Sequence, residues 1–334
     1  MGTLLSILTI AASAIIIVLD PTSMLVFYAL GTIILSHLLA WLLRAGPGWF
    51  AASTLLGWAA VMISTPLALT QSQLNALARI VRRERDGWEE AQATLNFFEP
   101  LVPYAVPLLI AVTVYFVVMA GLALGRARQG AHRYMLDAAN QLAHACTVVG
   151  KTAAILYVPM ILIILYDVAQ RKYLGWNPDF TSTDWYRMFT STRLQEMEWH
   201  LHATLFLLAL GFGYVRDAHV RIELVRDNLR PRTRAWIELF GALLFMVPYC
   251  YVVIQYGNEN AMRAFNIGEG SDALTGLPHR FIIKGMLPVG FVFVALAGLS
   301  AALKCVVYLF GPPGLRAEAG QYAGDHQPAA TAQA

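Results

Sequence analysis

A short run near the middle of the sequence is the only dense cluster of histidines and could in principle ligate a metal or a haem. Residues 195–202 read QEMEWHLH. Histidines on facing membrane helices can hold a haem, and histidine with carboxylate can bind zinc. His200 and His202 are two residues apart, so on a helix they point in different directions. This spacing disfavours haem, and zinc would need Glu196 or Glu198 as a further ligand.

The chain carries none of the short motifs that mark common enzyme sites. GxGxxG, GxxxxGK[ST], GxSxG and HExxH are all absent. The three cysteines are widely spaced and fall inside apolar blocks, so they predict neither a disulfide framework nor a CxxC metal site. We therefore predict no catalytic residue, no metal site, no cofactor and no nucleic-acid partner, and we do not expect an enzyme.

The elements that must position any such residues are predicted to be membrane helices. Hydrophobic residues make up 57% of the chain and charged residues 13%, with a mean hydropathy of +0.55. Crossing a bilayer takes roughly 20 apolar residues of helix, and we count about eight such blocks. They are residues 3–19, 22–43, 48–69, 101–124, 145–169, 199–215, 233–256 and 281–308. The predicted fold is an all-α, polytopic transmembrane bundle. A cleaved signal peptide is the alternative for the first block, although no Lys or Arg precedes it.

Charge is scarce within the predicted spans, and this argues against a substrate path inside the chain itself. Asp20, Asp167 and Glu238 lie near span ends, and Lys151 can snorkel to the interface. His37 is well inside a span, where packing or helix-to-helix hydrogen bonding is the more common role. Prolines interrupt several spans, but the surrounding segments do not repeat as they do in many transporters. The pattern favours a subunit of a larger assembly.

The polar segments set the expected orientation and boundaries. Arginines concentrate between the sixth and seventh spans, which places that segment and both termini on the cytoplasmic side. Between the third and fourth spans, residues 73–98 have the spacing of an interfacial amphipathic helix, with a solvated loop as the alternative. We predict an accessory membrane region over residues 1–128, a four-helix domain over 129–310 and a disordered tail over 311–334.

The second half contains four segments that resemble one transporter family. Residues 195–225 read QEMEWHLHATLFLLALGFGYVRDAHVRIELV, in which an acid and an aromatic open the span and a basic residue and His-Val-Arg close it. Lys172-Tyr173, RAWIELFGALLFMVP (234–248) and GEGSDALTGLPHRFIIKGMLP (268–288) agree with three further segments. These segments resemble the small permease subunit, of DctQ type, of TRAP transporters. The resemblance runs from about Cys146 to Tyr308. A Trp that commonly follows Pro278 in the family is replaced here by His279, Arg280 and Phe281.

The resemblance implies a function and a set of contact residues. It implies a tripartite, ion-gradient-driven importer in the bacterial inner membrane, with a large permease of DctM type and a periplasmic binding protein of DctP type. This chain would be a scaffold for the large permease. Candidate contacts with partners or membrane lipids are Glu196, Glu198, Trp199, Arg216, His219 and Arg221. Candidates for docking the binding protein are Glu269, Ser271, Asp272, Pro278 and Lys284, with Gly276 and Leu277 as further loop positions of the family.

Structural alternatives stay open at these positions. Glu196 and Glu198 could interact favourably with the helix dipole at the start of their helix, since helix N-termini favour acids. His219 and Arg221 could belong to a solvated positive loop, and the later loop could be plain connecting structure. For the whole chain, the alternatives are a haem- or quinone-linked anchor of a redox complex and a stand-alone channel or carrier. The resemblance does not extend to the residues before about Arg128.

Overall fold

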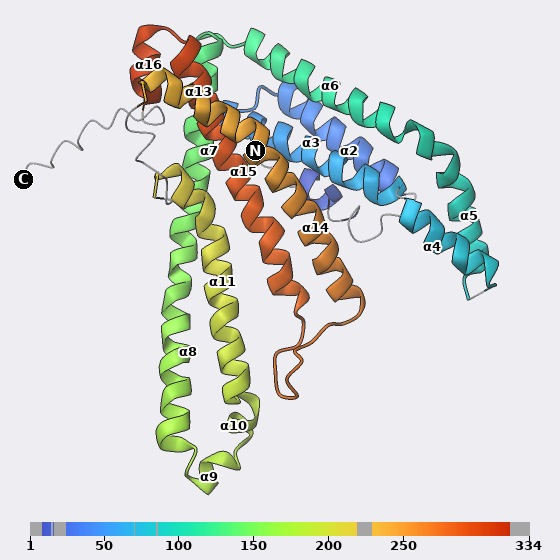
Figure 1. The fold of residues 1–334 in the computed structure, drawn as a ribbon, viewed down its shortest axis with the longest axis vertical. Coiled ribbons are helices and arrows are strands. Elements are labelled where there is room, and N and C mark those ends of the chain that lie inside the picture. Colours follow the sequence, from blue (N-terminus) through green and yellow to red (C-terminus); the bar gives the residue numbers. More distant parts are fainter. Residues whose placement is uncertain are drawn as a thin grey trace, which may run out of the picture. The chain divides into compact units, whose positions relative to one another are not determined.

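The computed structural model describes residues 9–14, 16, 25–69, 71–84, 86–218 and 229–320, and the regular structure of these residues is helical throughout (Figure 1). The predicted all-α class is confirmed. The chain divides into two compact units, Met1–Gln141 and Leu142–Ala334. This division lies within a helix, α7 (Ala131–Ala153). The domain boundary at residue 128 stays a prediction.

The helices have the following bounds. Those that begin in the first unit are α2 (Leu25–Leu42), α3 (Pro47–Leu69), α4 (Gln71–Arg82), α5 (Trp88–Phe98), the 3-10 helix η1 (Glu99–Tyr104), α6 (Ala105–Gly125) and α7. Those of the second unit are η2 (Ala154–Leu156), α8 (Tyr157–Ala169), the π-helix η3 (Gln170–Leu174), α9 (Pro178–Thr181), α10 (Asp184–Met188), α11 (Ser191–Val215), α13 (Pro231–Gly241), the π-helix η4 (Ala242–Met246), α14 (Val247–Asn266), α15 (Phe281–Phe310) and α16 (Pro313–Ala319).

Five helical stretches of the described residues are long and apolar enough to cross a membrane. They are Leu25–Leu42, Trp88–Gly125, Ala131–Leu174, Pro231–Asn266 and Phe281–Phe310, and Pro47–Ile63 is a shorter apolar helix. The predicted sixth span lies in α11, whose first turns carry polar and charged side chains. Most of the predicted first span lies outside the described residues. The bundle is thus confirmed as a membrane fold, whereas the count of about eight spans stays a prediction.

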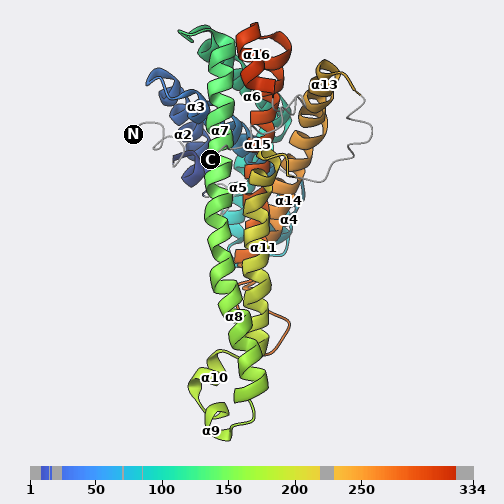
Figure 2. The same ribbon diagram turned by 90° about the vertical axis from the view of Figure 1, so that its left-hand side faces the viewer.

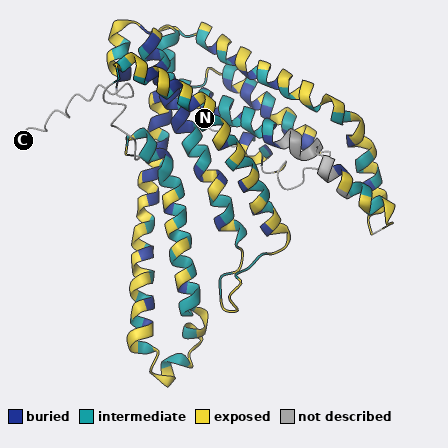
Figure 3. Cartoon of the chain, in the orientation of Figure 1, coloured by how far each residue is buried: buried dark blue, intermediate teal, exposed yellow. Residues whose placement is uncertain are grey.

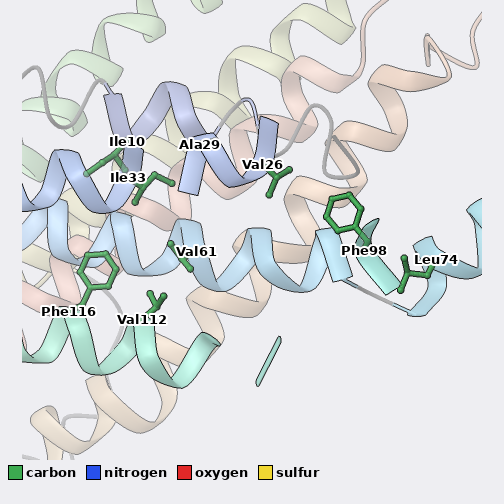
Figure 4. Close-up of a cluster of buried hydrophobic side chains, with 9 residues drawn as sticks. All are labelled: Ile10, Val26, Ala29, Ile33, Val61, Leu74, Phe98, Val112 and Phe116. Carbon is green, nitrogen blue, oxygen red and sulfur yellow. The ribbon is translucent and has the colours of Figure 1, made fainter. Parts of the chain in front are cut away.

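The core of the first unit is formed by apolar side chains that are far apart in the sequence (Figure 4). Its buried members are Ile10, Val26, Ala29, Ile33, Val61, Leu74, Phe98, Val112 and Phe116. Next to it, His37 is fully buried, with its ring nitrogens 2.9 Å from Thr54 Oγ1 and 3.3 Å from the Tyr115 hydroxyl. His37 therefore joins three helices by hydrogen bonds, which is the role that its position predicted.

The predicted interfacial helix is two helices, α4 and α5, rather than one. The turn between them contains Gly87 at φ 81° and Glu84 at φ 44°, and a left-handed backbone ends a helix. On α4, Leu74 is buried and Leu77 is half-buried, whereas Arg79 is exposed. The amphipathic pattern is therefore present on α4, the first of the two helices.

The second unit is organised around α15, which packs against α11, α14 and α13 (Figures 1 and 2). Two glycines allow the backbones of α11 and α15 to touch. A Cβ on Gly290 would lie 2.8 Å from the Leu207 carbonyl oxygen, and one on Gly211 would lie 2.7 Å from the Phe293 carbonyl oxygen. Small residues at helix contacts are the usual means of close approach in membranes.

Large apolar side chains remain exposed along α8 and along the segment from η4 to α14 (Figure 3). On α8 they recur at helical intervals, at Val158, Ile161, Leu162 and Leu165. A helix in a bilayer needs no polar outer face, because lipid tails are as apolar as its side chains. These faces are suited to lipid or to a partner helix.

The segment that we expected to be disordered begins with ordered structure. Residues Pro313–Ala319 form α16, which packs on the end of α15, and Arg316 Nε donates to the Gly311 carbonyl at 2.6 Å. The helix begins at Pro313, and proline is common at the first position of a helix. The remaining predicted tail, from residue 321, lies outside the described residues.

Candidate functional site

The loop between α14 and α15 is fastened to the start of α11 by one carboxylate. Glu196 accepts hydrogen bonds on both oxygens, from the Ser271 hydroxyl on Oε1 and from the Leu277 N–H on Oε2 at 2.6 Å. The Ser271 N–H in turn donates to the Leu277 carbonyl at 3.0 Å. Residues 271 and 277 thus form the neck of a small closed loop, and Glu196 holds that neck.

Ion pairs hold the two ends of the same loop together. Lys284 Nζ lies 2.8 and 2.6 Å from the two carboxylate oxygens of Glu269. Arg280 lies 3.3 Å from Asp272, and its backbone N–H donates to the Glu269 carbonyl at 3.0 Å. Glu269 and Lys284 are only partly exposed, so their pair is better shielded than the Arg280 pair, in which Asp272 is almost fully exposed.

The close packing at the neck of the loop requires a glycine at position 276. A Cβ there would collide with Ser271 and would lie 2.9 Å from Glu196 Oε1. Elsewhere in this loop, Gly268 at φ 62° and His279 at φ 63° adopt left-handed backbone. Gly and Pro residues favour a turn in this loop, but its conformation depends on the carboxylate of a distant helix as well.

A second set of contacts ties the loop to the residues before and within the first turn of α11. The Thr275 carbonyl accepts from Arg193 Nε at 3.0 Å and from the Thr190 hydroxyl at 3.4 Å. Arg193 also donates to the Met188 carbonyl, at the end of α10. The α14–α15 loop and the α9–α10 segment therefore lie at the same end of the second unit (Figure 1).

The electrostatic setting keeps Glu196 ionised. Burial raises the pKa of the Glu196 carboxyl, but hydrogen bonds from Leu277 and Ser271 and the positive charge of Arg280 outweigh this effect, so the pKa lies below its ordinary value. Charge-assisted bonds to a backbone N–H and a hydroxyl are strong ones. The loop is therefore held by a charged acceptor at neutral pH.

The predicted docking residues divide into two groups by exposure. Glu269, Ser271 and Lys284 face one another or Glu196 and are half-buried. Asp272 and Pro278 are exposed, as is Leu274, a neighbouring residue outside the predicted set that projects fully from the surface. The first group shapes the loop, and the second is available to another molecule.

Sequence reasoning placed Asp167 of the neighbouring helix α8 near the end of a span, but it did not predict that this carboxylate is buried and paired. Asp167 is 1% exposed, accepts from the Ser191 hydroxyl at 2.6 Å and lies 2.6 Å from Arg171. The i, i+4 spacing of Asp167 and Arg171 was the signal available in the sequence. Ser191 is the first residue of α11, so this group fixes α8 against the helix that carries Glu196.

Residues 160–307 match the family model described as Tripartite ATP-independent periplasmic transporters, DctQ component. This part of the chain belongs to the DctQ family. The match covers most of the segment in which we had found the resemblance, including α11, the α14–α15 loop and most of α15. Comparisons with curated proteins and with solved structures gave no match. Proteins of the DctQ family are components of transporters. The helices before α8 precede the matched residues.

The other predicted contact residues of the DctQ region lie apart from the loop. Trp199 is exposed on α11, and Arg216 is exposed at its far end, with its guanidinium 5.7 Å from the Phe212 ring centre. Glu198 is half-buried, and burial together with the charge of Asp167 raises its pKa. His219 and Arg221 lie outside the described residues.

The helix-dipole explanation for the two glutamates is wrong. α11 begins at Ser191 and has no acid in its first turn, so Glu196 and Glu198 lie beyond the reach of a capping interaction. Of the two histidines in the same run, His200 has its Nδ1 2.5 Å from the Glu196 carbonyl, one turn earlier in the helix. The family match gives no support to the haem- or quinone-linked alternative.

Proposed function

We propose that this chain is the small membrane subunit of a tripartite, ion-gradient-driven solute importer of the bacterial inner membrane. It braces a large permease of DctM type and helps to dock a periplasmic binding protein of DctP type. The observation that carries the proposal is the Glu196-anchored α14–α15 loop within a region of DctQ type.

The scaffold role is supported by the character of the second unit's helices. Their exposed faces are apolar over long stretches of α8 and α14, which suits packing against another membrane protein. The buried carboxylate of Asp167 is already paired with Arg171 and Ser191, as a structural group would be. A rigid helical support with paired polar groups is what a static subunit needs.

The docking role is supported by the way in which the loop is built. Its neck is held by hydrogen bonds and ion pairs, so its exposed tip is presented with little freedom, and a preorganised surface loses less entropy on binding. The tip offers one carboxylate, Asp272, beside the apolar Leu274. In the proposed orientation, with both termini cytoplasmic, this loop faces the periplasm.

The first test is co-purification. A tagged chain, expressed together with its genomic neighbours in a neutral detergent, is expected to bring down a large multi-span permease in near-equimolar amount. Recovery of the chain alone under conditions that keep it folded would contradict the scaffold role. An absorbance spectrum of the same sample tests the rival hypothesis, because a Soret band would indicate a haem-linked anchor.

The second test concerns the tip of the loop. Changing Asp272 to Asn and Leu274 to Ser together should weaken binding of the cognate binding protein about five- to tenfold, since one charge and one apolar contact are removed. Surface plasmon resonance on the reconstituted membrane complex measures this. Glu89→Gln, an exposed carboxylate on α5, is the control and should leave the affinity unchanged. Equal affinity in the loop variant would exclude the tip from docking.

A further inference from the structure

The first unit contains a cavity of about 550 Å³ that the proposed transport function does not use. It lies where α2 and α6 end and where α3 and α7 begin. Its lining includes three arginines and three aromatic residues, namely Arg44, Arg126, Arg128, Trp41, Phe50 and Tyr134. All of these residues belong to the first unit, so the cavity is complete within it.

The cavity is lined by hydrogen-bond donors and positive charge. No Asp or Glu contributes to its lining. Within the part of the chain that the structure describes, none of the three guanidinium groups is paired with a carboxylate. Arginine is the side chain best suited to bidentate recognition of phosphate. This composition favours an anionic ligand with several acceptor oxygens.

The side chain of Trp41 gives a second, independent indication. Its indole N–H is buried and has no hydrogen-bond partner among the described residues. An unsatisfied buried donor costs free energy, so a site that leaves one unpaired is suited to an acceptor from outside the protein. Arg126 lies over the same ring, with its guanidinium carbon 3.5 Å from the ring centre, and this stacking holds the guanidinium in place.

The backbone next to Trp41 is also unusual. Arg44 adopts a left-handed conformation at φ 53°, which costs free energy for a residue with a side chain. It terminates α2, so the chain turns there and the Arg44 side chain lines the cavity. Gly46 follows two residues later, but the left-handed position itself is occupied by an arginine.

The place of the cavity along the helices indicates the source of the anion. α2 and α6 are candidate membrane spans, and the cavity is at the ends of both, where apolar sequence gives way to arginine. That level is the membrane–water interface, where phospholipid headgroups lie. Basic pockets between membrane helices on the cytoplasmic side are known to suit anionic headgroups, and the proposed orientation puts this end on that side.

We propose that this cavity binds a phosphate group, presented by the headgroup of an anionic phospholipid. Arg44, Arg126 and Arg128 supply the charge, and the Trp41 N–H donates to a phosphate oxygen. Inorganic phosphate shares this chemistry and is the other possible source. The site gives the additional helices of this chain a role in lipid recognition that is independent of the DctQ region.

The test is thermal unfolding of the purified full chain in a neutral detergent. Phosphatidylglycerol should raise the unfolding midpoint by about 4 °C at saturation, whereas phosphatidylcholine should have little effect. The variant Arg44→Gln/Arg126→Gln/Arg128→Gln should lose this shift. The matched control, Arg79→Gln/Arg82→Gln/Arg83→Gln, removes the same charge from around α4 and should keep it.

The remaining arms distinguish the sources and keep the proposal falsifiable. If inorganic phosphate alone gives the full shift, and the cavity variant abolishes that shift, the site binds phosphate but its source is soluble. An undiminished phosphatidylglycerol shift in the cavity variant, or an equal shift with phosphatidylcholine, would overturn the proposal. If the triple variant does not fold, the single variants Arg44→Gln and Arg128→Gln replace it. Each should weaken lipid binding about fivefold or more, as measured by native mass spectrometry. Unchanged binding in both single variants would also overturn the proposal.

Discussion

Replacing Gly290 by leucine is expected to abolish the packing of α15 on α11 and with it most of the folded protein. A Cβ at this position would lie 2.8 Å from the carbonyl oxygen and 2.9 Å from the Cβ of Leu207. Two backbones that touch can accommodate a side chain only by moving apart, and α15 is the helix on which α11, α13 and α14 all pack. Overpacking of this kind costs about 3 kcal/mol or more. Size-exclusion chromatography in detergent measures the folded fraction.

The structure offers matched controls for this result on the same two helices. Gly285 in α15 and Gly213 in α11 have open space where a Cβ would be, so Gly285→Leu and Gly213→Leu should fold normally. Gly211→Leu should behave like Gly290→Leu, because its Cβ would lie 2.7 Å from the Phe293 carbonyl oxygen. If all four variants elute alike, the close approach of α11 and α15 is not needed for folding.

Replacing Glu196 by alanine is expected to leave the fold intact but to reduce binding-protein-dependent uptake about tenfold. The change removes both acceptors that hold the neck of the α14–α15 loop, so its tip is no longer presented in one conformation. Bonds to a charged but partly exposed group contribute about 1–2 kcal/mol in total. Uptake by proteoliposomes that contain the complete transporter measures the effect, and hydrogen exchange at the Leu277 amide reports on the loop.

The neighbouring Gln195 supplies the control for this substitution. It is exposed, and its amide donates to the Ser191 hydroxyl of its own helix, so Gln195→Ala should change neither uptake nor exchange at Leu277. Glu196→Gln retains an acceptor for one of the two donors and should give an intermediate effect. If Glu196→Ala shows full uptake together with rapid exchange at Leu277, the ordered conformation of the loop is not needed for transport.

The same carboxylate predicts a pH dependence of the loop. The folded pKa of Glu196 is lowered, so its contribution to stability is present above the unfolded pKa and is lost as the pH falls through the folded value. Exchange at the Leu277 amide, corrected for its intrinsic pH dependence, should therefore show protection that declines in acid. In Glu196→Gln this acid-dependent loss should be absent, because no proton is taken up.

Some of the fold followed from the sequence because it depends on local pattern. Apolar blocks long enough to span a bilayer predict helices wherever they occur, since the backbone must satisfy its own hydrogen bonds in lipid. The blocks at residues 281–308 and 101–124 correspond closely to α15 and α6. The polar run 126–144 is mostly α7, because an amphipathic sequence folds as a helix once one face is covered.

The sequence by itself thus determined membrane residence, helical class and the DctQ family, all of which depend on composition, block length and the order of short segments. The tertiary structure alone decided which groups the candidate residues contact. Glu196 meets Ser271 and Leu277 across 75 and 81 residues of chain, and Arg44 shares a cavity with Arg126. The physical reason is that hydrogen bonds and cavities are short-range features, so they depend on which helices pack together. The local periodicity of a sequence predicts a helix but does not specify its neighbours.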